Sequence, residues 1–318
     1  MKHTLNATII LLSIFLLTQV FGLFTVSNYL EVYEKDGKLS IGYPNTALGE
    51  APVVQEKSWT FVYIFIGILV GTALLFFFIK LKVGSFWRYW FFLSVCVAMT
   101  ISFGVYFGGI IGFVIALILS ILKIYKPNFY THNLSEIFIY TGIVVLFLPI
   151  INLFSACLLL IFISIYDYIA VFKSKHMITL AKFQTESKVF AGLSIPYRIK
   201  KDKAVKIHET PSKEIKSESF KKESSSKKEG RVAILGGGDV AFPLIFSSAA
   251  MIYLIEVMQI AKSTALIYSY IISITATISL YVLLYYGKKD KFYPAMPVIS
   301  AGCFIGLGLI YLIRLLSF

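Results

Sequence analysis

The sequence predicts an all-α, polytopic membrane protein, and three observations support that fold class. Hydrophobic residues make up 58% of the 318 residues, with a mean hydropathy of +0.79, whereas about half of the residues in soluble domains are apolar. Several apolar stretches reach about 18 residues or more, the length that a helix needs to cross roughly 30 Å of hydrocarbon. These stretches lack strand-like alternation, so helices are favoured over a transmembrane barrel.

Nine spans are predicted, six before a long polar loop and three after it. The expected ranges are 5–26, 59–79, 86–103, 105–122, 134–148 and 151–172, followed by 232–255, 264–286 and 296–314. The first is interpreted as a retained helix rather than a signal peptide, because its apolar run is long and has no small-x-small cleavage site. We therefore expect an N-terminal half over 1–172, a connecting loop over 173–231 and a C-terminal half over 232–318.

The connecting loop is strongly basic, with 16 Lys and Arg against 7 Asp and Glu. Its high charge and low apolar content predict a flexible segment. With the N-terminus in the cytoplasm, 25 of the 30 Lys and Arg residues fall on the cytoplasmic side, as the positive-inside rule expects. The net charge of +13 is therefore assigned to membrane orientation and anionic lipid, and nucleic acid is not an expected partner. We expect a multi-pass protein of the cell membrane, with its N-terminus and long loop in the cytoplasm.

Two carboxylates, Asp167 and Asp239, lie within predicted spans. An ionisable residue in a membrane span is costly and is a functional-site hypothesis by default. Asp167 is near the cytoplasmic end of the sixth span, and Asp239 is about eight residues into the seventh, which runs the opposite way. At 1.5 Å per residue both lie within roughly 8–12 Å of the same face. If the two spans pack together, the carboxylates can share a proton. One would then activate water while the other polarises a peptide carbonyl.

Small residues and prolines accompany the two carboxylates. Gly236, Gly237 and Gly238 precede Asp239, and they allow close helix approach and weaken the helix, so that an extended substrate can enter. The segment 293–297 holds two prolines and is predicted to be non-helical at the depth of the carboxylates, which is tolerated where backbone lines a cavity.

These features together resemble the YD, GxGD and PAL motifs of the presenilin and signal peptide peptidase family of intramembrane aspartyl proteases. The matching residues are Tyr166 and Asp167; Gly236, Gly237, Gly238 and Asp239; and Pro294, Ala295 and Met296. The resemblance covers nearly the whole chain and implies that the two aspartates are the catalytic pair. It also implies that the third motif shapes the active site and helps to hold substrate as an added strand.

The chain departs from the family pattern at Met296, where leucine is usual, and at the additional Pro297. These departures concern substrate preference more than chemistry. The basic loop matches the presenilin-like orientation, and the compact chain is similar to the archaeal members. The expected partners are transmembrane helices of substrate proteins and the lipid bilayer, without obligate partner subunits.

Other interpretations were weighed against this one. Membrane carboxylates also serve ion- or proton-coupled secondary transporters and channels, but the six-plus-three layout has no inverted repeat. A non-catalytic scaffold that binds helices is a third class, and Asp167 taken alone also fits an interfacial residue. The run 232–238 imitates a strand that enters a nucleotide-binding glycine loop, but the pattern fails at Ala241. The scattered cysteines and histidines predict no metal site and no cofactor.

Overall fold

The computed structural model describes residues 4–52, 54, 56–81, 84–174, 190–198, 230–287 and 293–316. Nine α-helices of 17 to 25 residues lie within these ranges. They are α1 (Leu5–Tyr29), α2 (Thr60–Leu81), α3 (Gly84–Phe107), α4 (Gly109–Tyr125), α5 (Phe129–Phe147), α6 (Leu153–Ile169), α8 (Gly237–Glu256), α9 (Lys262–Tyr286) and α10 (Met296–Leu316). A 3₁₀ turn (Lys57–Trp59) precedes α2, and a π-helical turn (Ala170–Ser174) extends α6.

Seven helices in the described part of the chain are long and apolar enough to cross a membrane. They correspond to seven of the nine predicted spans. Helix α4 is a shorter apolar helix, and α5 is outside the set of seven. The spans predicted at 105–122 and 134–148 therefore form helices, while their passage across the membrane stays a prediction.

Two β-hairpins make the all-α prediction incomplete. One joins β1 (Glu31–Lys35) to β2 (Lys38–Gly42), and the other joins β3 (Gly192–Arg198) to β4 (Gly230–Gly236). The prediction that 232–255 is one helix is wrong at its start, because 232–236 belongs to β4. A short apolar run with β-branched residues is compatible with helix or strand, and pairing with β3 selects the strand.

Strand β3 also corrects the description of the connecting loop, since it places ordered structure inside 173–231. The stretches 175–189 and 199–229, on which the prediction of flexibility chiefly rests, lie outside the described residues.

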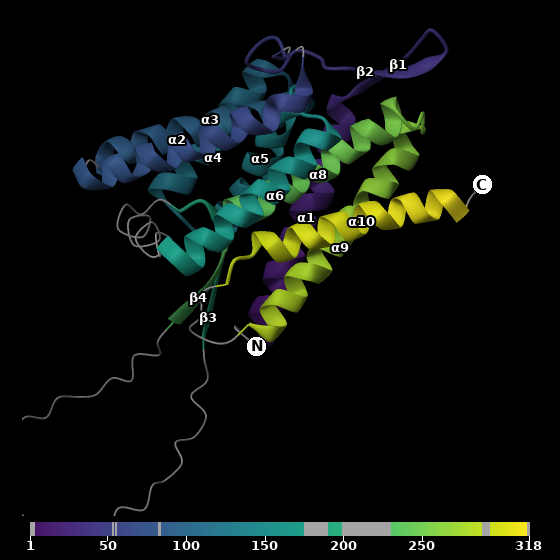
Figure 1. The fold of residues 1–318 in the computed structure, drawn as a ribbon. Coiled ribbons are helices and arrows are strands. Elements are labelled where there is room, and N and C mark those ends of the chain that lie inside the picture. Colours follow the sequence, from purple (N-terminus) through teal and green to yellow (C-terminus); the bar gives the residue numbers. More distant parts are fainter. Residues whose placement is uncertain are drawn as a thin grey trace, which may run out of the picture.

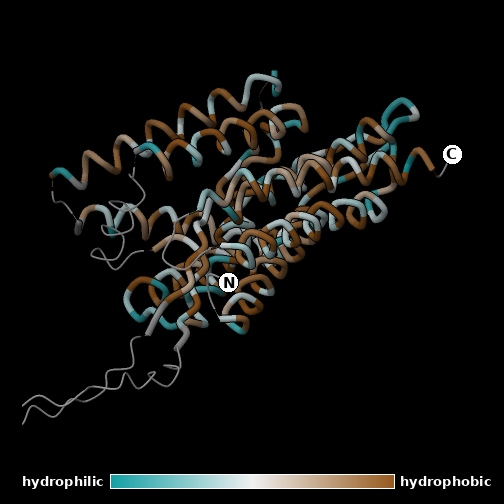
Figure 2. The backbone as a smooth tube through the Cα atoms, turned by 60° about the horizontal axis from the view of Figure 1, so that its bottom comes forward, coloured by the Kyte–Doolittle hydropathy of each residue, from teal (hydrophilic) through white to brown (hydrophobic). Residues whose placement is uncertain are grey.

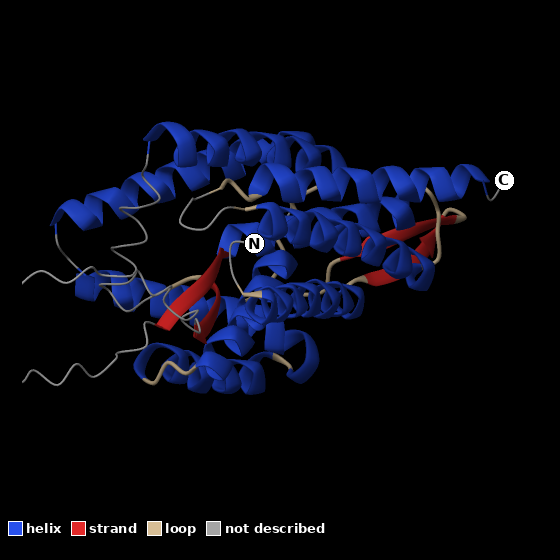
Figure 3. Ribbon diagram, turned by 90° about the horizontal axis from the view of Figure 1, so that it is seen from below, coloured by secondary structure: helices blue, strands red, loops and turns tan. Residues whose placement is uncertain are grey.

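The helices run side by side, and the two hairpins lie at opposite ends of them (Figures 1 and 3). Helix α8 is central and packs against α1, α5, α6, α9 and α10. Apolar residues extend along the lengths of the helices, as Figure 2 shows. Strand β4 leads directly into α8, so it joins the bundle at its central helix.

Close helix crossings depend on glycine. Gly142 of α5 faces the backbone of Ala98 in α3, and Gly306 of α10 faces Thr275 and Ile272 of α9. A Cβ atom at either glycine would overlap these neighbours. Small residues at such crossings allow the dense packing that holds helices together in lipid.

Candidate active site

Asp239 lies where a strand becomes a helix. Gly236 ends β4 with extended backbone (φ −62°, ψ 147°) and is the N-cap of α8, which begins at Gly237. Asp239 is therefore the third residue of α8, and the prediction that it lies about eight residues into a helix is wrong. The unpaired N–H groups of a first helical turn attract negative charge. The position thus suits a carboxylate.

A large cavity opens beside Asp239. Its volume is about 930 Å³, and its walls include Gly236, Gly237 and Gly238 together with Tyr293 and Ala295. Most of the other lining side chains are apolar. The cavity therefore brings the second and third predicted motifs to one place, inside the helix bundle.

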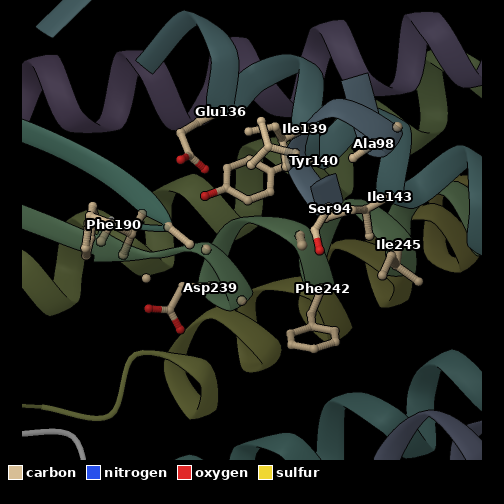
Figure 4. A pocket seen from close by; sticks show the side chains of 18 of the residues that line it. Ser94, Ala98, Glu136, Ile139, Tyr140, Ile143, Phe190, Asp239, Phe242 and Ile245 are labelled. Carbon is tan, nitrogen blue, oxygen red and sulfur yellow. The ribbon is translucent and has the colours of Figure 1, made fainter. Parts of the chain in front are cut away.

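Tyr140 of α5 forms part of the cavity wall. Figure 4 shows its hydroxyl directed toward the side where Glu136 and Asp239 lie. A Cβ atom at Gly237 would lie only 2.9 Å from this hydroxyl oxygen. The absence of a side chain at Gly237 thus allows α5 and the start of α8 to approach closely.

Asp167 lies in the last turn of α6, just before the π-helical turn. Its Oδ2 atom accepts a hydrogen bond from the N–H of Met296 at 3.1 Å, and the Ala295 amide also interacts with the carboxylate. Met296 is the first residue of α10, so its N–H lacks a partner within its own helix. Asp167 therefore caps α10 from a neighbouring helix and ties the first predicted motif to the third.

The predicted residues do not all face the cavity. Asp167, Tyr166, Pro294 and Met296 are outside its lining, whereas Ala295, adjacent to the Asp167-bound amide, is part of it. Helices α6 and α8 pack against each other, which is the condition that the sequence analysis set for the two carboxylates to meet. The meeting of the two carboxylates stays a prediction, and so do the catalytic roles.

Helices α4 and α5 form a polar cluster that was not predicted from the sequence. Lys123 Nζ lies 2.5 Å from Glu136 Oε1, and the two side chains are only 2% and 1% exposed. His132 and Asn133 of α5 contact the backbone of β3. Glu136 falls inside the span predicted at 134–148, so the signal that identified the two aspartates also marks this residue.

Among the residues that the structure describes, no three His, Cys, Asp or Glu side chains are grouped so as to hold a metal ion. The polar groups gathered around the cavity are two carboxylates, two phenols, a serine hydroxyl and backbone amides. These groups can bind a peptide and transfer protons.

Comparison with known proteins identifies a family and a fold for the chain. A family model described as signal-peptide peptidase, presenilin aspartyl protease matches residues 12–318. No curated protein sequence matches the chain. Two solved structures, each described as a presenilin family intramembrane aspartate protease, share the fold. The one in space group P2 has a TM-score of 0.55 and 17% identity, over 95% of each chain. The other, in C222, has a TM-score of 0.57 and 15% identity, over 94% of this chain and 97% of that chain.

The family match extends over nearly the whole sequence. The enzyme class predicted from the three motifs is confirmed, as is the assignment to the membrane. The chain belongs to the signal-peptide peptidase and presenilin family of aspartyl proteases, and it is an integral membrane aspartic protease.

Proposed function

We propose that the protein hydrolyses peptide bonds within transmembrane segments of other membrane proteins, with Asp167 and Asp239 as the catalytic pair. The observation that carries this assignment is the bond from the Met296 N–H to Asp167. It connects Asp167 to the segment whose neighbouring residue, Ala295, shares the cavity with Asp239. The ion- or proton-coupled transporter is the alternative that the family membership does not favour.

The reaction divides its proton transfers between the two aspartates. The ionised carboxylate takes a proton from water as the water oxygen bonds to the scissile carbonyl carbon, while the protonated carboxyl donates to the carbonyl oxygen. Collapse of the tetrahedral intermediate breaks the C–N bond: the aspartate that took a proton from water donates it to the leaving nitrogen, and the other aspartate takes a proton from a hydroxyl of the intermediate, which becomes the carboxyl of the product. A pair of close carboxylates holds one proton between them at the start, because both cannot ionise cheaply.

The substrate backbone enters as an extended strand along β4. This strand pairs with β3 on one edge, and no other described strand pairs with its second edge. Val232 and Ile234 of β4 are 49% and 54% exposed. A peptide added to this edge satisfies its backbone hydrogen bonds within the membrane. The edge also leads directly to Gly236 and Asp239.

The orientation follows from charge. The N-terminus and the basic segment 173–231 lie in the cytoplasm, which puts most Lys and Arg residues there. The cut then falls in the cytoplasmic third of the bilayer of the cell membrane. The substrates are single transmembrane helices, and the enzyme acts without obligate partner subunits.

The test is cleavage of a tagged single-span substrate by the purified protein in lipid vesicles. Wild type is compared with Asp167→Asn and Asp239→Asn, which preserve side-chain size. We expect cleavage by the wild type and none by either variant, with unchanged helix content by circular dichroism. Substantial cleavage by either variant contradicts the assignment of the pair.

A further inference from the structure

One edge of the β3–β4 hairpin is occupied by side chains of α5. His132 Nε2 lies 2.8 Å from the carbonyl oxygen of Gly192. Asn133 Nδ2 donates to the carbonyl oxygen of Ser194 at 2.9 Å, and Asn133 Oδ1 accepts from the Ser194 N–H at 3.1 Å. The Asn133 amide thus takes both backbone groups of Ser194, as a neighbouring strand would. Ser194 is opposite Ile234 of β4, so this is a non-hydrogen-bonded pair of the ladder.

A buried ion pair orients His132. Lys123 Nζ lies 3.2 Å from His132 Nδ1 and also contacts Glu136. An ammonium group only donates, so Nδ1 accepts, and the ring proton is on Nε2, facing Gly192. Buried ion pairs contribute little net stability relative to apolar packing, and their best-attested use is to specify geometry. Lys123 and Glu136 hold the imidazole in the tautomer that binds β3.

The contacts of His132 and Asn133 with β3, called the α5 anchor below, are connected to Asp239 through β3 and β4. Strand β3 fixes β4 by pairing along seven residues, from Gly192 opposite Gly236 to Arg198 opposite Gly230. Strand β4 ends at Gly236, three residues before Asp239, without an intervening loop. The position of the open edge of β4 relative to Asp239 is therefore set by where α5 holds β3.

The position of this edge has a chemical consequence. A peptide strand on an antiparallel ladder moves in steps of two residues, about 7 Å. Each step presents a different peptide bond to the same carboxylate. An edge that is held firmly selects one of these bonds, and a loosely held edge allows more than one.

We infer that Asn133 and His132, oriented by the buried Lys123–Glu136 pair, are positioning residues that fix the β3–β4 hairpin relative to Asp239 and so determine which substrate bond is cut. This role rests on the proposed function, and it assigns specificity to side chains of α5 that do not touch the carboxylates. Its signature is a change in product termini rather than a uniform loss of rate.

The other hairpin offers a matched control. Gln259 binds Leu39 of β2 in the same manner, since its Oε1 accepts from the Leu39 N–H at 2.6 Å and its Nε2 donates to the Leu39 carbonyl at 3.2 Å. Gln259 is thus held against β2, and the β1–β2 hairpin lies at the opposite end of the helices from β3 and β4 (Figure 3). Asn133→Asp and Gln259→Glu make the same chemical change, each placing a carboxylate oxygen against a backbone carbonyl, at a buried position for Asn133 and an exposed one for Gln259. Only Asn133→Asp alters the hairpin beside Asp239.

The experiment measures the termini of the cleavage products by mass spectrometry, using the purified full chain and one single-span substrate. For Asn133→Asp we expect less than half of the product to have the main wild-type terminus. The rest should end about two residues away from it. Gln259→Glu is expected to keep the wild-type pattern. An unchanged pattern in Asn133→Asp, or the same change in both variants, overturns the inference. A wild-type protein that cuts nothing contradicts the proposed function instead.

A second measurement reports on the anchor without activity. Ser194→Cys with Ile234→Cys places two thiols at a non-hydrogen-bonded pair, where side chains are closest. We expect efficient disulfide formation in this variant and at least a threefold lower yield when Asn133→Asp is added. Ser194→Cys with Val232→Cys, a register two residues away, should gain yield in the same background. Equal yields with and without Asn133→Asp overturn the inference, whatever the activity assay gives.

Discussion

Helices α2 and α8 show opposite relations between apolar character and burial. The most apolar stretch of α2 has a hydropathy of 2.6, yet none of it is buried within the protein. The corresponding stretch of α8 has a hydropathy of only 1.7, and 78% of it is buried. In lipid the outer helices need apolar side chains on every face, whereas an inner helix is free to carry small and polar residues. Within this pair the more apolar helix is at the periphery, and α8, which carries Asp239, is recognised by the small and polar residues that interrupt its apolar sequence.

Many buried serines and threonines bond to the backbone of their own helix. Ser247 and Ser248 of α8 are fully buried, and their hydroxyls donate to the carbonyls of Pro243 and Leu244. Such back-bonding satisfies the two hydroxyls without a partner helix. The interior polar groups that do bind other elements, such as Glu136 and Asp167, are then the ones with structural or chemical consequences.

The largest difference between interior and periphery is expected at charged residues. Glu136→Ala leaves Lys123 buried without its carboxylate, which costs about 3–5 kcal/mol. Lys80→Ala in α2, at an exposed position, should change stability by about 0.5 kcal/mol or less. Chemical denaturation in detergent micelles measures both. Equal losses from the two variants would mean that the Lys123–Glu136 pair has no special role in the interior.

A second comparison uses the same substitution in both helices. Ala250 of α8 is fully buried, and Ala73 of α2 is exposed. Ala250→Leu overpacks the centre of the bundle and should destabilise it by about 1–3 kcal/mol, while Ala73→Leu should be nearly neutral because it faces lipid. Thermal unfolding in detergent separates these outcomes. A neutral Ala250→Leu would contradict the central position of α8.

A third prediction concerns the contact between Gly237 and Tyr140. Gly237→Ala brings a methyl group to about 2.9 Å from the tyrosine hydroxyl, and we expect kcat/KM to fall about tenfold, which corresponds to about 1.4 kcal/mol. Tyr140→Phe removes the hydroxyl and should restore part of that loss in the double variant. A double-mutant cycle of cleavage rates measures the coupling. Strictly additive effects would show that the two residues do not meet as described.

The smallest effect is expected for a hydrogen bond between helices. Ser164 of α6 donates to Ser300 of α10 at 2.9 Å, and such bonds in membrane proteins contribute about 0.6 kcal/mol on average. Ser300→Ala should cost about that amount. Thr72→Val of α2 removes a hydroxyl that bonds only within its own helix, and its effect on unfolding in detergent should be smaller still. The reverse order would argue against the tie between α6 and α10.

Much of the helix layout could be predicted because hydropathy and proline act locally. The range 264–286 is helical as α9 (Lys262–Tyr286), and α10 begins at Met296, as the predicted span 296–314 requires. The prediction that 293–297 is non-helical is wrong at Met296 and Pro297, because proline is tolerated in the first turn of a helix. The beginning of α8 could not be predicted in this way. Whether 232–236 is strand or helix depends on pairing with Gly192–Arg198, which lies well upstream in a charged part of the sequence.

The candidate site likewise has features that could be predicted from the sequence and features that depend on contacts between distant segments. Asp167, Asp239 and the segment at 294–296 could be proposed from the sequence because an ionisable residue or a proline is unusual within an apolar membrane span. The bond between Asp167 and Met296 could not, since it joins the end of one helix to the start of another. The α5 anchor was not predicted because it consists of contacts between α5 and the backbone of β3. The position of Glu136 in the sequence does not reveal these contacts.

The central claim is that Asp167 and Asp239 meet at one site, and disulfide trapping tests it most directly. The double variant Asp167→Cys, Asp239→Cys is oxidised in lipid beside Ser164→Cys, Ser300→Cys, whose native hydroxyl oxygens lie 2.9 Å apart. Both pairs are predicted to form an intramolecular disulfide, which requires Cα atoms within about 7 Å. Trapping of the serine pair without trapping of the aspartate pair would contradict the claim.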